Sequence, residues 1–294
     1  MDFEIFADSG CDIPLETMRE KNIHPVYFYV SFDDKNYIKE KLEIDTGTYY
    51  RKMIEEKLFP KTSLPSVSDY VEAFTPVLEE GKAIICICMS LTLSGSYQSA
   101  KTAKDVLKET YPHAHITVID SRMCTVEEGL YVLEAAKMRD AGMSYRDTVA
   151  ELKGLLPTGR ICFTVGDLEH LKRGGRIGNL TFIAGSVLKV KPLIVMKEGE
   201  LVSGGLARNE AKSLKKLLEI ARDYFEKTKE NPNDFQFVVG KNIEDDKAQN
   251  LAEKVKDTFW LSSDVPIWQI GATVATHTGP YALGFAFLKK AVLC

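Results

Sequence analysis

The sequence predicts an α/β protein of two closely docked domains, the first built on a mostly parallel sheet and the second on a mixed sheet. In the first half, short apolar segments alternate with segments that have the period of a helix. This alternation is typical of βαβ units, which make parallel sheets. In the second half, KPLIVMKEGELV (191–202) has the pattern of a hairpin that turns at Glu198-Gly199, and a hairpin requires antiparallel pairing.

In the first half, strands are expected where apolar and β-branched residues cluster between turn residues. These segments lie at 3–8, 25–32, 82–89 and 115–120. Helices are expected where apolar residues recur every three or four positions. They comprise a short helix from Leu15 and helices at 46–57, about 68–78 and 95–110, with two more within 125–156. KTSLPSVSD, which begins at Lys61, is expected to be a loop.

The second half begins with a strand at 160–165, and DLEHLKRGGRIG (167–178) is typical of a helix that ends at glycines. Further helices are expected at 180–190, 208–229 and 245–258, and further strands at 235–240 and 266–277. A final helix is expected at 280–290. We place the domain boundary near residue 158, which gives domains of 1–158 and 159–294, and no long linker separates them.

The composition narrows the possible partners. The 294 residues are 45% hydrophobic and 27% charged, with a net charge of −4 and no dense Lys/Arg run, so nucleic acid is not expected as a partner. The N-terminal residues lack the pattern of a signal peptide, and no apolar stretch is long enough to cross a bilayer, so we expect a cytoplasmic protein. Six scattered cysteines are expected to be reduced thiols, and no metal site is predicted.

Two polar loops of the first half carry candidate functional residues. KTSLPSVSD contains Thr62 and Ser63 beside Pro65, and alone it is typical of an ordinary turn. In SLTLSGSYQSA, Ser94 occupies the expected cap of a helix, and Gly95 permits close approach of another group. This cap follows the carboxyl end of a strand, where parallel sheets bind their ligands. Anion binding and capping alone are therefore equally favoured.

A third loop, ATHTGPYALGFAF, combines a histidine, a hydroxyl and the expected start of a helix. His277 is expected to end a strand, Thr278 follows it, and Pro280 suits the first turn of the last helix. The alternative is a histidine that is hydrogen-bonded within the core. The helix start shifts the balance modestly toward anion binding.

The segment KRGGRIG (172–178) places Lys172, Arg173 and Arg176 around two glycines. Its spacing is neither that of a P-loop nor that of a dinucleotide fingerprint, so nucleotide binding is not predicted. Two interpretations are equally favoured. The cations complement the C-terminal dipole of a solvated helix end, or they form a small basic surface for a partner or for acidic head groups.

Together these segments resemble the DegV family, whose characterised members are fatty-acid-binding subunits of bacterial fatty acid kinase. The resemblance runs nearly end to end, and the order and spacing of its motifs are specific. The motifs are DSGCDIP (8–14), TSLPS (62–66), LSGSYQSA (93–100), VIDSRM (118–123), DLEHLKRGGRIG (167–178), KPLIVMKEGEL (191–201) and THTGP (276–280). The chain differs at Leu64, where the family usually has Gln, but it retains the hydroxyls of that loop.

The resemblance implies a carrier rather than an enzyme. It implies that a long-chain fatty acid such as palmitate, stearate or oleate lies in the inter-domain region as the only bound ligand. A separate fatty acid kinase catalytic subunit would then phosphorylate the carboxylate for phospholipid synthesis, with transient contact to a membrane surface. The residues carried over by position are Thr62, Ser94 and His277 for the carboxylate, with Ser63, Gly95 and Thr278 beside them, and Arg173 and Arg208 for docking the kinase.

The chemistry of the loops agrees with such a ligand. Hydroxyls, backbone N–H groups and an imidazole offset the desolvation of a carboxylate without a fixed full charge. The alkyl chain would supply most of the affinity, at about 0.8 kcal/mol per buried methylene. Two other functions stay open. One is a serine-dependent hydrolase or acyltransferase with Ser94 as nucleophile and His277 as base, although LSGS is not the GxSxG elbow. The other is a binding module for another small anionic lipid.

Overall fold

The computed structural model of the chain describes the backbone of residues 1–183 and 190–293 and the side chains of 1–180 and 190–293. Its strands are β1 (Phe3–Asp8), β2 (Ile23–Val26), β3 (Tyr29–Ser31), β4 (Ile38–Lys39), β5 (Lys61–Ser63), β6 (Ala83–Cys88), β7 (Ile116–Asp120), β8 (Arg160–Thr164), β9 (Lys191–Lys197), β10 (Glu200–Ala207), β11 (Phe235–Lys241), β12 (Ile267–Gln269) and β13 (Leu283–Lys289). Its α-helices are α1 (Leu15–Glu20), α2 (Thr46–Glu55), α3 (Val67–Glu79), α4 (Ser96–Thr110), α5 (Thr125–Asp140), α6 (Tyr145–Leu155), α7 (Glu169–Arg173), α8 (Glu210–Thr228), α9 (Asp245–Phe259) and α10 (Ala272–Thr278). No helix within these described ranges is long and apolar enough to span a membrane.

The first half forms a four-stranded sheet in the order β2-β1-β6-β7, and every pairing in it is parallel. Helices cover both faces of this sheet, which explains why β6 is an uninterrupted apolar run with all six residues buried. Both Cys86 and Cys88 lie in that run as free, buried thiols. The parallel α/β sheet predicted for the first half is therefore confirmed.

The second half forms a six-stranded mixed sheet in the order β10-β9-β8-β13-β11-β12. Only the β11–β12 pairing is parallel. The expected hairpin joins β9 to β10 through Glu198 and Gly199, whose φ angles of 54° and 91° are those of a two-residue turn that suits the twist of the strands. The predicted mixed sheet is thus confirmed, and with it the two-domain α/β fold class.

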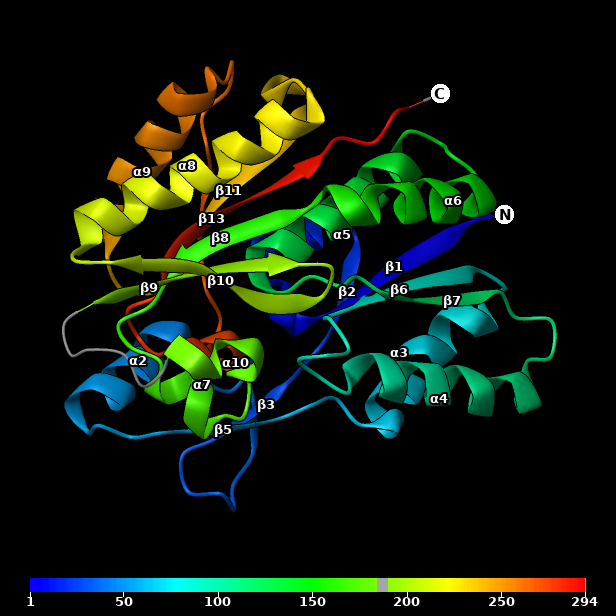
Figure 1. Cartoon of the computed structure of the whole chain (residues 1–294). Coiled ribbons are helices and arrows are strands. Elements are labelled where there is room, and N and C mark those ends of the chain that lie inside the picture. The colour runs from blue at the N-terminus through cyan, green and yellow to red at the C-terminus, as the bar shows by residue number, and fades with distance from the viewer. Residues whose placement is uncertain (184–189, 294) are drawn as a thin grey trace.

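The two sheets lie on opposite sides of one buried helix (Figure 1). Helix α5 packs between them, and its side chains share one core with β1, β6, β8 and β9. On the outer faces, α3 and α4 cover the parallel sheet, while α8 and α9 cover the mixed sheet. Because α5 is covered on all sides, it shows little helical amphipathicity, as expected for a buried helix.

A small third sheet closes one end of the molecule and was not predicted. The segment 25–32, expected as one strand, is divided between β2 in the parallel sheet and β3 in this antiparallel sheet, whose order is β4-β3-β5. Strand β5 comes from a segment for which a loop was predicted. That prediction was wrong because the short polar sequence lacks the alternation of apolar and polar residues that indicates a strand. Helices α2 and α10 pack on this sheet around Val30, Tyr49 and Ala275.

The C-terminal prediction was wrong in two elements. The segment 266–277 contains only the short strand β12 before it becomes helix α10, and the expected helix 280–290 is strand β13. Strand β13 pairs with β8 and β11, and its alternate residues belong to the cores on the two sides of the sheet. Both faces are therefore buried, and its apolar run resembles that of a buried helix. In α10 the hydroxyls of Thr276 and Thr278 donate to carbonyls four residues earlier, so these polar groups are paired within the helix.

Two further predictions are not decided. The helix expected at 180–190 overlaps a 3-10 helix at Gly178–Ile183, and the rest of it falls on 184–189, outside the described residues. The domain boundary near residue 158 stays a prediction. It falls at a short 3-10 helix, Leu156–Thr158, which connects α6 to β8.

Candidate functional site

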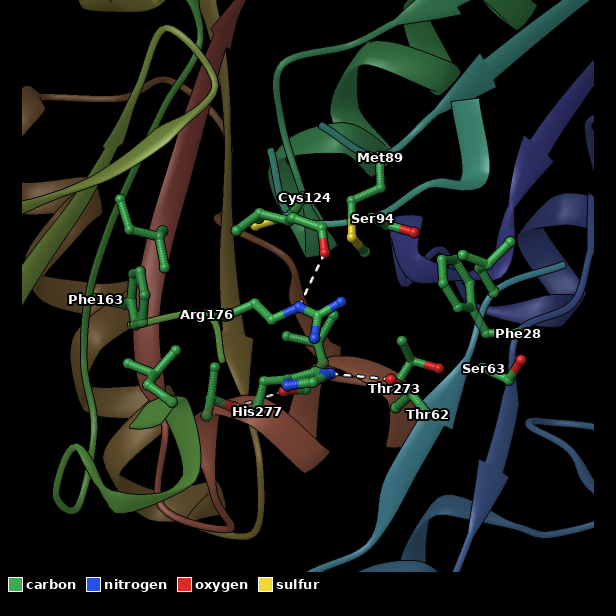
Figure 2. A pocket seen from close by; sticks show the side chains of 16 residues that line it. Phe28, Thr62, Ser63, Met89, Ser94, Cys124, Phe163, Arg176, Thr273 and His277 are labelled. Atoms are coloured by element: carbon green, nitrogen blue, oxygen red, sulfur yellow. Dashed lines mark hydrogen bonds between the residues drawn. The ribbon is translucent and has the colours of Figure 1, made fainter. Parts of the chain in front are cut away.

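A cavity lies where strands of the parallel sheet end and the second half of the chain faces them (Figure 2). Its volume is about 220 Å³, whereas roughly 10–15 Å³ is enough for one water molecule. Residues after the carboxyl ends of β2, β6 and β7 form one side, which is where parallel sheets bind ligands. The lining residues are Phe28, Thr62, Ser63, Leu64, Met89, Leu93, Ser94, Cys124, Phe163, Leu171, Arg176, Leu201, Thr273, Val274, His277 and Thr278.

Five of the residues selected from the sequence line this one cavity: Thr62, Ser63, Ser94, His277 and Thr278. They come from β5, the loop before α4, and α10, so segments more than 200 positions apart meet here.

Three other selected residues lie elsewhere. Gly95 does not line the cavity, but a Cβ there would stand 3.1 Å from Cδ2 of Leu64, which does. Gly95 therefore leaves room for the Leu64 side chain. Arg173 forms an ion pair with Glu169 at 2.6 Å on exposed α7, and Arg208 is an exposed residue after β10.

The Thr62 hydroxyl and the His277 ring are hydrogen-bonded, with 3.0 Å between Oγ1 and Nε2. Burial, with smaller contributions from the neighbouring Arg176 and His170, lowers the pKa of His277 to about 4. The imidazole is therefore neutral near pH 7. The element predicted for His277 was wrong, because the residue lies in the last turn of α10 rather than at the end of a strand before a helix start.

The surroundings of the second ring nitrogen indicate the tautomer. Nδ1 of His277 is buried, has no hydrogen-bond partner among the described residues, and packs so tightly on Gly174 that a Cβ there would lie 2.1 Å from it. An unpaired acceptor is tolerated in the interior more readily than an unpaired N–H. We therefore assign the proton to Nε2, which donates to Thr62 Oγ1. The Thr62 O–H is then free to donate into the cavity.

Arg176, which the sequence indicated only as part of a solvated helix end or a small basic surface, lines the cavity. It is the only charged side chain among the described residues that line the cavity. Its Nε donates to the carbonyl of Leu93 at 3.0 Å and its Nη1 to the carbonyl of Gly174 at 2.6 Å. Figure 2 shows its guanidinium pointing into the space between the labelled side chains. The expectation of a site without a fixed full charge was therefore wrong.

The end of α7 explains how Arg176 reaches the cavity. Gly175 has φ of +69°, the N–H of Arg176 bonds to the carbonyl of Leu171, and the N–H of Gly175 bonds to that of Lys172. These two bonds are the Schellman motif, which reverses the chain after a helix. The glycine pair in KRGGRIG was the available signal, because it predicts a turn that sends the next residue back toward the helix.

The observed N-cap of α4 is Gly95 rather than the predicted Ser94, but Ser94 still bonds to the start of the helix. Its Oγ accepts the N–H of Ser96 in the first turn of α4 at 3.1 Å, and its side chain also lines the cavity. The hydroxyl proton is not used in that bond, so it can be donated to a ligand. The loop between β6 and α4 is held in place at both ends by the buried Asp8 carboxylate. It accepts hydrogen bonds from the Ser96 hydroxyl at 2.6 Å and from the Met89 N–H at 2.9 Å.

Two buried carboxylates from the first half hold the beginning of α10. Asp12 accepts the N–H of Gly271 at 2.9 Å, and Glu40 accepts the N–H of Thr273 at 2.8 Å. Carboxylates at a helix N-terminus satisfy donors that the helix leaves unpaired and complement its dipole. Burial raises the pKa of Asp12 to about 6, while Lys41, 3.5 Å away, acts in the opposite direction. This network fixes the helix that carries His277.

The geometry does not favour a serine hydrolase. Ser94 Oγ is bonded to a backbone N–H and His277 Nε2 to Thr62, so the two are not arranged as nucleophile and base. No carboxylate within the described residues orients Nδ1 of His277, as a catalytic triad requires. Two free hydroxyl protons, one guanidinium and apolar walls instead suit an anion that carries a hydrocarbon chain.

Comparison with known proteins gives concordant matches along the whole chain. A family model described as an uncharacterised protein of the DegV family matches residues 2–290. A DegV domain-containing protein of Clostridium perfringens is 33% identical over 293 residues, which cover 97% of this chain and 97% of that protein.

Solved structures share the fold. A stearic-acid-binding protein from Eubacterium ventriosum superposes with a TM-score of 0.92 at 36% identity, covering 98% of both chains. A structure described as fatty acid binding of a DegV family protein, from Thermus thermophilus, has a TM-score of 0.89 at 29% identity and covers 98% of this chain and 100% of that one.

Proposed function

This chain belongs to the DegV family, and we propose that it binds a long-chain fatty acid in the cavity described above. The observation that carries the proposal is that hydrogen-bond donors and one guanidinium gather in an otherwise mostly apolar cavity. The similar proteins described as binding stearic acid and fatty acid support the same ligand class. Palmitate, stearate and oleate are the candidate ligands.

In this proposal Thr62, Ser94 and Arg176 contact the carboxylate directly. Taking a carboxylate out of water is costly unless hydrogen bonds and an opposite charge compensate for it. Arg176 supplies the charge, and the two hydroxyls supply O–H donors. His277 remains neutral and acts on the ligand through Thr62, because its Nε2–H occupies one lone pair of Oγ1 and turns the O–H toward the cavity.

The alkyl chain would contact the apolar lining residues. These are Phe28, Leu64, Met89, Leu93, Phe163, Leu171, Leu201 and Val274. At about 0.8 kcal/mol per buried methylene, a sixteen-carbon acid offers on the order of 12 kcal/mol before the cost of association is subtracted. The alkyl chain of the ligand therefore determines the affinity, and the polar residues of the cavity determine the orientation of the head group.

We further propose that the protein is a carrier subunit that presents the carboxylate to a separate ATP-dependent kinase. A carboxylate oxygen bonds to the γ-phosphorus of ATP, the bond from that phosphorus to its bridging oxygen breaks, and ADP leaves with the electron pair. The absence of a nucleotide-binding motif in the sequence supports a separate catalytic subunit. Exposed Arg173 and Arg208 are the candidate docking residues. Phospholipid synthesis is the proposed fate of the acyl phosphate.

Lipid extraction and native mass spectrometry of purified protein test the ligand. We expect a bound fatty acid, or uptake of added palmitate or oleate at a ratio of one per chain. Apolar solvent extraction followed by reloading controls for loosely attached lipid. A protein that carries no fatty acid and takes up none would contradict the proposal.

Reconstitution with a fatty acid kinase catalytic subunit, ATP and palmitate tests presentation. Acyl phosphate is trapped by hydroxylamine as the hydroxamate, and we expect Ser94→Ala to lower its yield. Unchanged yield with Ser94→Ala would remove that residue from the mechanism.

We also propose a cytoplasmic location, with transient contact to a membrane surface during exchange of the ligand. The five cysteines among the described residues are free and buried, which is consistent with a reducing compartment.

A further inference from the structure

One hydroxyl in the wall of the cavity described above has no partner. Thr273 lines the cavity and is 4% exposed, and its Oγ1 is buried without a hydrogen bond to any residue that the structure describes. Among the described side chains with a buried, unpaired polar atom, only Thr273 and His277 line this cavity. Buried hydroxyls are normally hydrogen-bonded, so an unpaired one in the wall of a binding site indicates a partner that the ligand supplies.

Helix α10 places this hydroxyl next to the proposed carboxylate position. Thr273 and His277 are four residues apart in the helix, so their side chains lie on the same face, one turn from each other. That face is turned toward β5, because His277 Nε2 is hydrogen-bonded to Thr62 Oγ1. Figure 2 shows these three labelled side chains together at one side of the cavity. Thr273 is therefore a neighbour of the hydroxyl that is proposed to hold the carboxylate.

The main chain of Thr273 is fixed, whereas its hydroxyl is not. Its N–H donates to Oε2 of the buried Glu40 at 2.8 Å. In the same helix, the hydroxyls of Thr276 and Thr278 pair with carbonyls four residues earlier. For Thr273 the corresponding carbonyl belongs to Gln269, in β12 before the helix begins, and no such bond forms. Rotation of the Thr273 side chain between staggered positions therefore breaks no hydrogen bond.

We propose that Thr273 is a further ligand-binding residue, whose hydroxyl turns into the cavity and donates to the ligand carboxylate beside Thr62. The inference rests on the proposed function and adds a third hydroxyl to it. A carboxylate offers about four lone-pair positions, and Thr62, Ser94 and Arg176 fill three of them when each donates one bond. The Thr273 hydroxyl has already lost its contact with water in the free protein. Its bond to the carboxylate therefore replaces no bond to water on the protein side, which makes its contribution to affinity larger than that of an exposed hydroxyl.

Replacing Thr273 with valine separates ligand binding from a structural role, because valine has nearly the same shape and lacks only the hydroxyl. Without ligand, Thr273→Val should be at least as stable in urea unfolding as wild type, since it loses no hydrogen bond and removes an unpaired polar atom. Palmitate binding, measured by displacement of a fluorescent fatty acid, should weaken about tenfold. A residue that only supports the fold would lose stability and affinity together.

Thr148→Val is the matched control. Thr148, on α6, also has a buried hydroxyl without a partner among the described residues, but it does not line the cavity. The control variant should show the same unchanged or increased stability, with the palmitate affinity of wild type. Thr273→Ser keeps the hydroxyl and should therefore keep most of the affinity. Because hydrogen bonds to a charged acceptor are the stronger ones, Thr273→Val should weaken palmitate binding more than 1-hexadecanol binding.

Four results would overturn the inference. Wild-type palmitate affinity in Thr273→Val would remove the hydroxyl from the site, and an equal loss in Thr273→Ser would show that packing is responsible. A fall in stability that accompanies the fall in affinity would assign Thr273 a structural role. A loss for 3-hydroxypalmitate without a loss for palmitate would mean that the hydroxyl pairs with a substituent of the alkyl chain instead of the carboxylate. If wild-type protein does not bind palmitate at all, the proposed function fails instead, so the two failures are distinguishable.

Discussion

Replacing Thr62 with valine tests the head-group geometry, because the change removes one hydroxyl and nearly preserves the shape of the side chain. In the structure that hydroxyl accepts from His277 Nε2 at 3.0 Å and has its own proton free for the ligand. A hydrogen bond to a charged group contributes about 1.5–3 kcal/mol. Thr62→Val should therefore weaken palmitate binding roughly 10- to 150-fold.

The same substitution has a second, independent effect on stability. It leaves the buried Nε2–H of His277 without an acceptor, and an unsatisfied buried donor costs about 1–3 kcal/mol. We expect the free energy of unfolding in urea, measured without ligand, to fall by that amount. Thr62→Ser keeps the hydroxyl, so it should lose much less of both affinity and stability.

Displacement of a fluorescent fatty acid by palmitate provides the affinity measurement. If Thr62→Val binds palmitate as wild type does, the Thr62 hydroxyl does not contact the carboxylate and the reasoning fails. If Thr62→Ser, which keeps the hydroxyl, loses as much affinity as Thr62→Val, the affinity depends on the packing of the side chain rather than on its hydroxyl, and the proposed hydrogen bond is again refuted.

Three further predictions follow from the same site. Because the pKa of His277 is lowered to about 4 from 6.5, its contribution to stability is complete above pH 6.5 and is lost as pH falls toward 4. Burial raises the pKa values of Asp8 and Asp12 to about 6, so the stability that these two residues contribute is lost as pH rises through 6, which is the opposite direction. The difference in unfolding free energy between wild type and His277→Gln therefore isolates the histidine. Arg176→Gln should weaken palmitate binding about tenfold or more and affect 1-hexadecanol much less, as measured by displacement titration. Gly174→Ala should displace the His277 ring, since the new Cβ would lie 2.1 Å from Nδ1, and lower palmitate affinity about tenfold.

Each of these predictions has a control and an opposing outcome. A pH-independent stability difference between wild type and His277→Gln would contradict the low pKa. Equal losses for the acid and the alcohol would mean that Arg176 acts on packing rather than on charge. Gly154→Ala controls for alanine substitution, because a Cβ there meets nothing within 4 Å. Normal palmitate binding by Gly174→Ala would show that the ring position is not important.

The sequence predicted correctly those elements in which the hydrophobic period and the turn and cap residues indicate the same structure. The parallel strands, the hairpin at Glu198 and Gly199 and the loop before α4 were all evident, because they depend on nearby residues. Thr62, Ser94 and His277 line one cavity, and they were selected through the resemblance to a family more than through any local signal. The hydroxyls alone were equally compatible with turns and caps.

The errors arose where distant contacts determine the local structure. Helix α10 is stabilised by Asp12 and Glu40, which lie more than 230 positions away, so no local pattern indicated it. Strand β13 is covered on both faces and paired on both sides, and a continuous apolar run does not distinguish such a strand from a buried helix. The sequence placed Arg176 at a solvated helix end or on a basic surface and not in the cavity, because the chain reversal that directs it inward is not a helical pattern.

The position of α5 bears on how the two halves depend on each other. This helix belongs to the first half of the chain but fills the space between the two large sheets. A fragment that ends at residue 158 would therefore expose the apolar face of α5 that packs against β8 and β9. The complementary fragment would lack the helix that covers its inner face. We expect neither fragment to be stable by itself, so the protein should unfold in a single cooperative transition although its two large sheets lie in different halves of the chain.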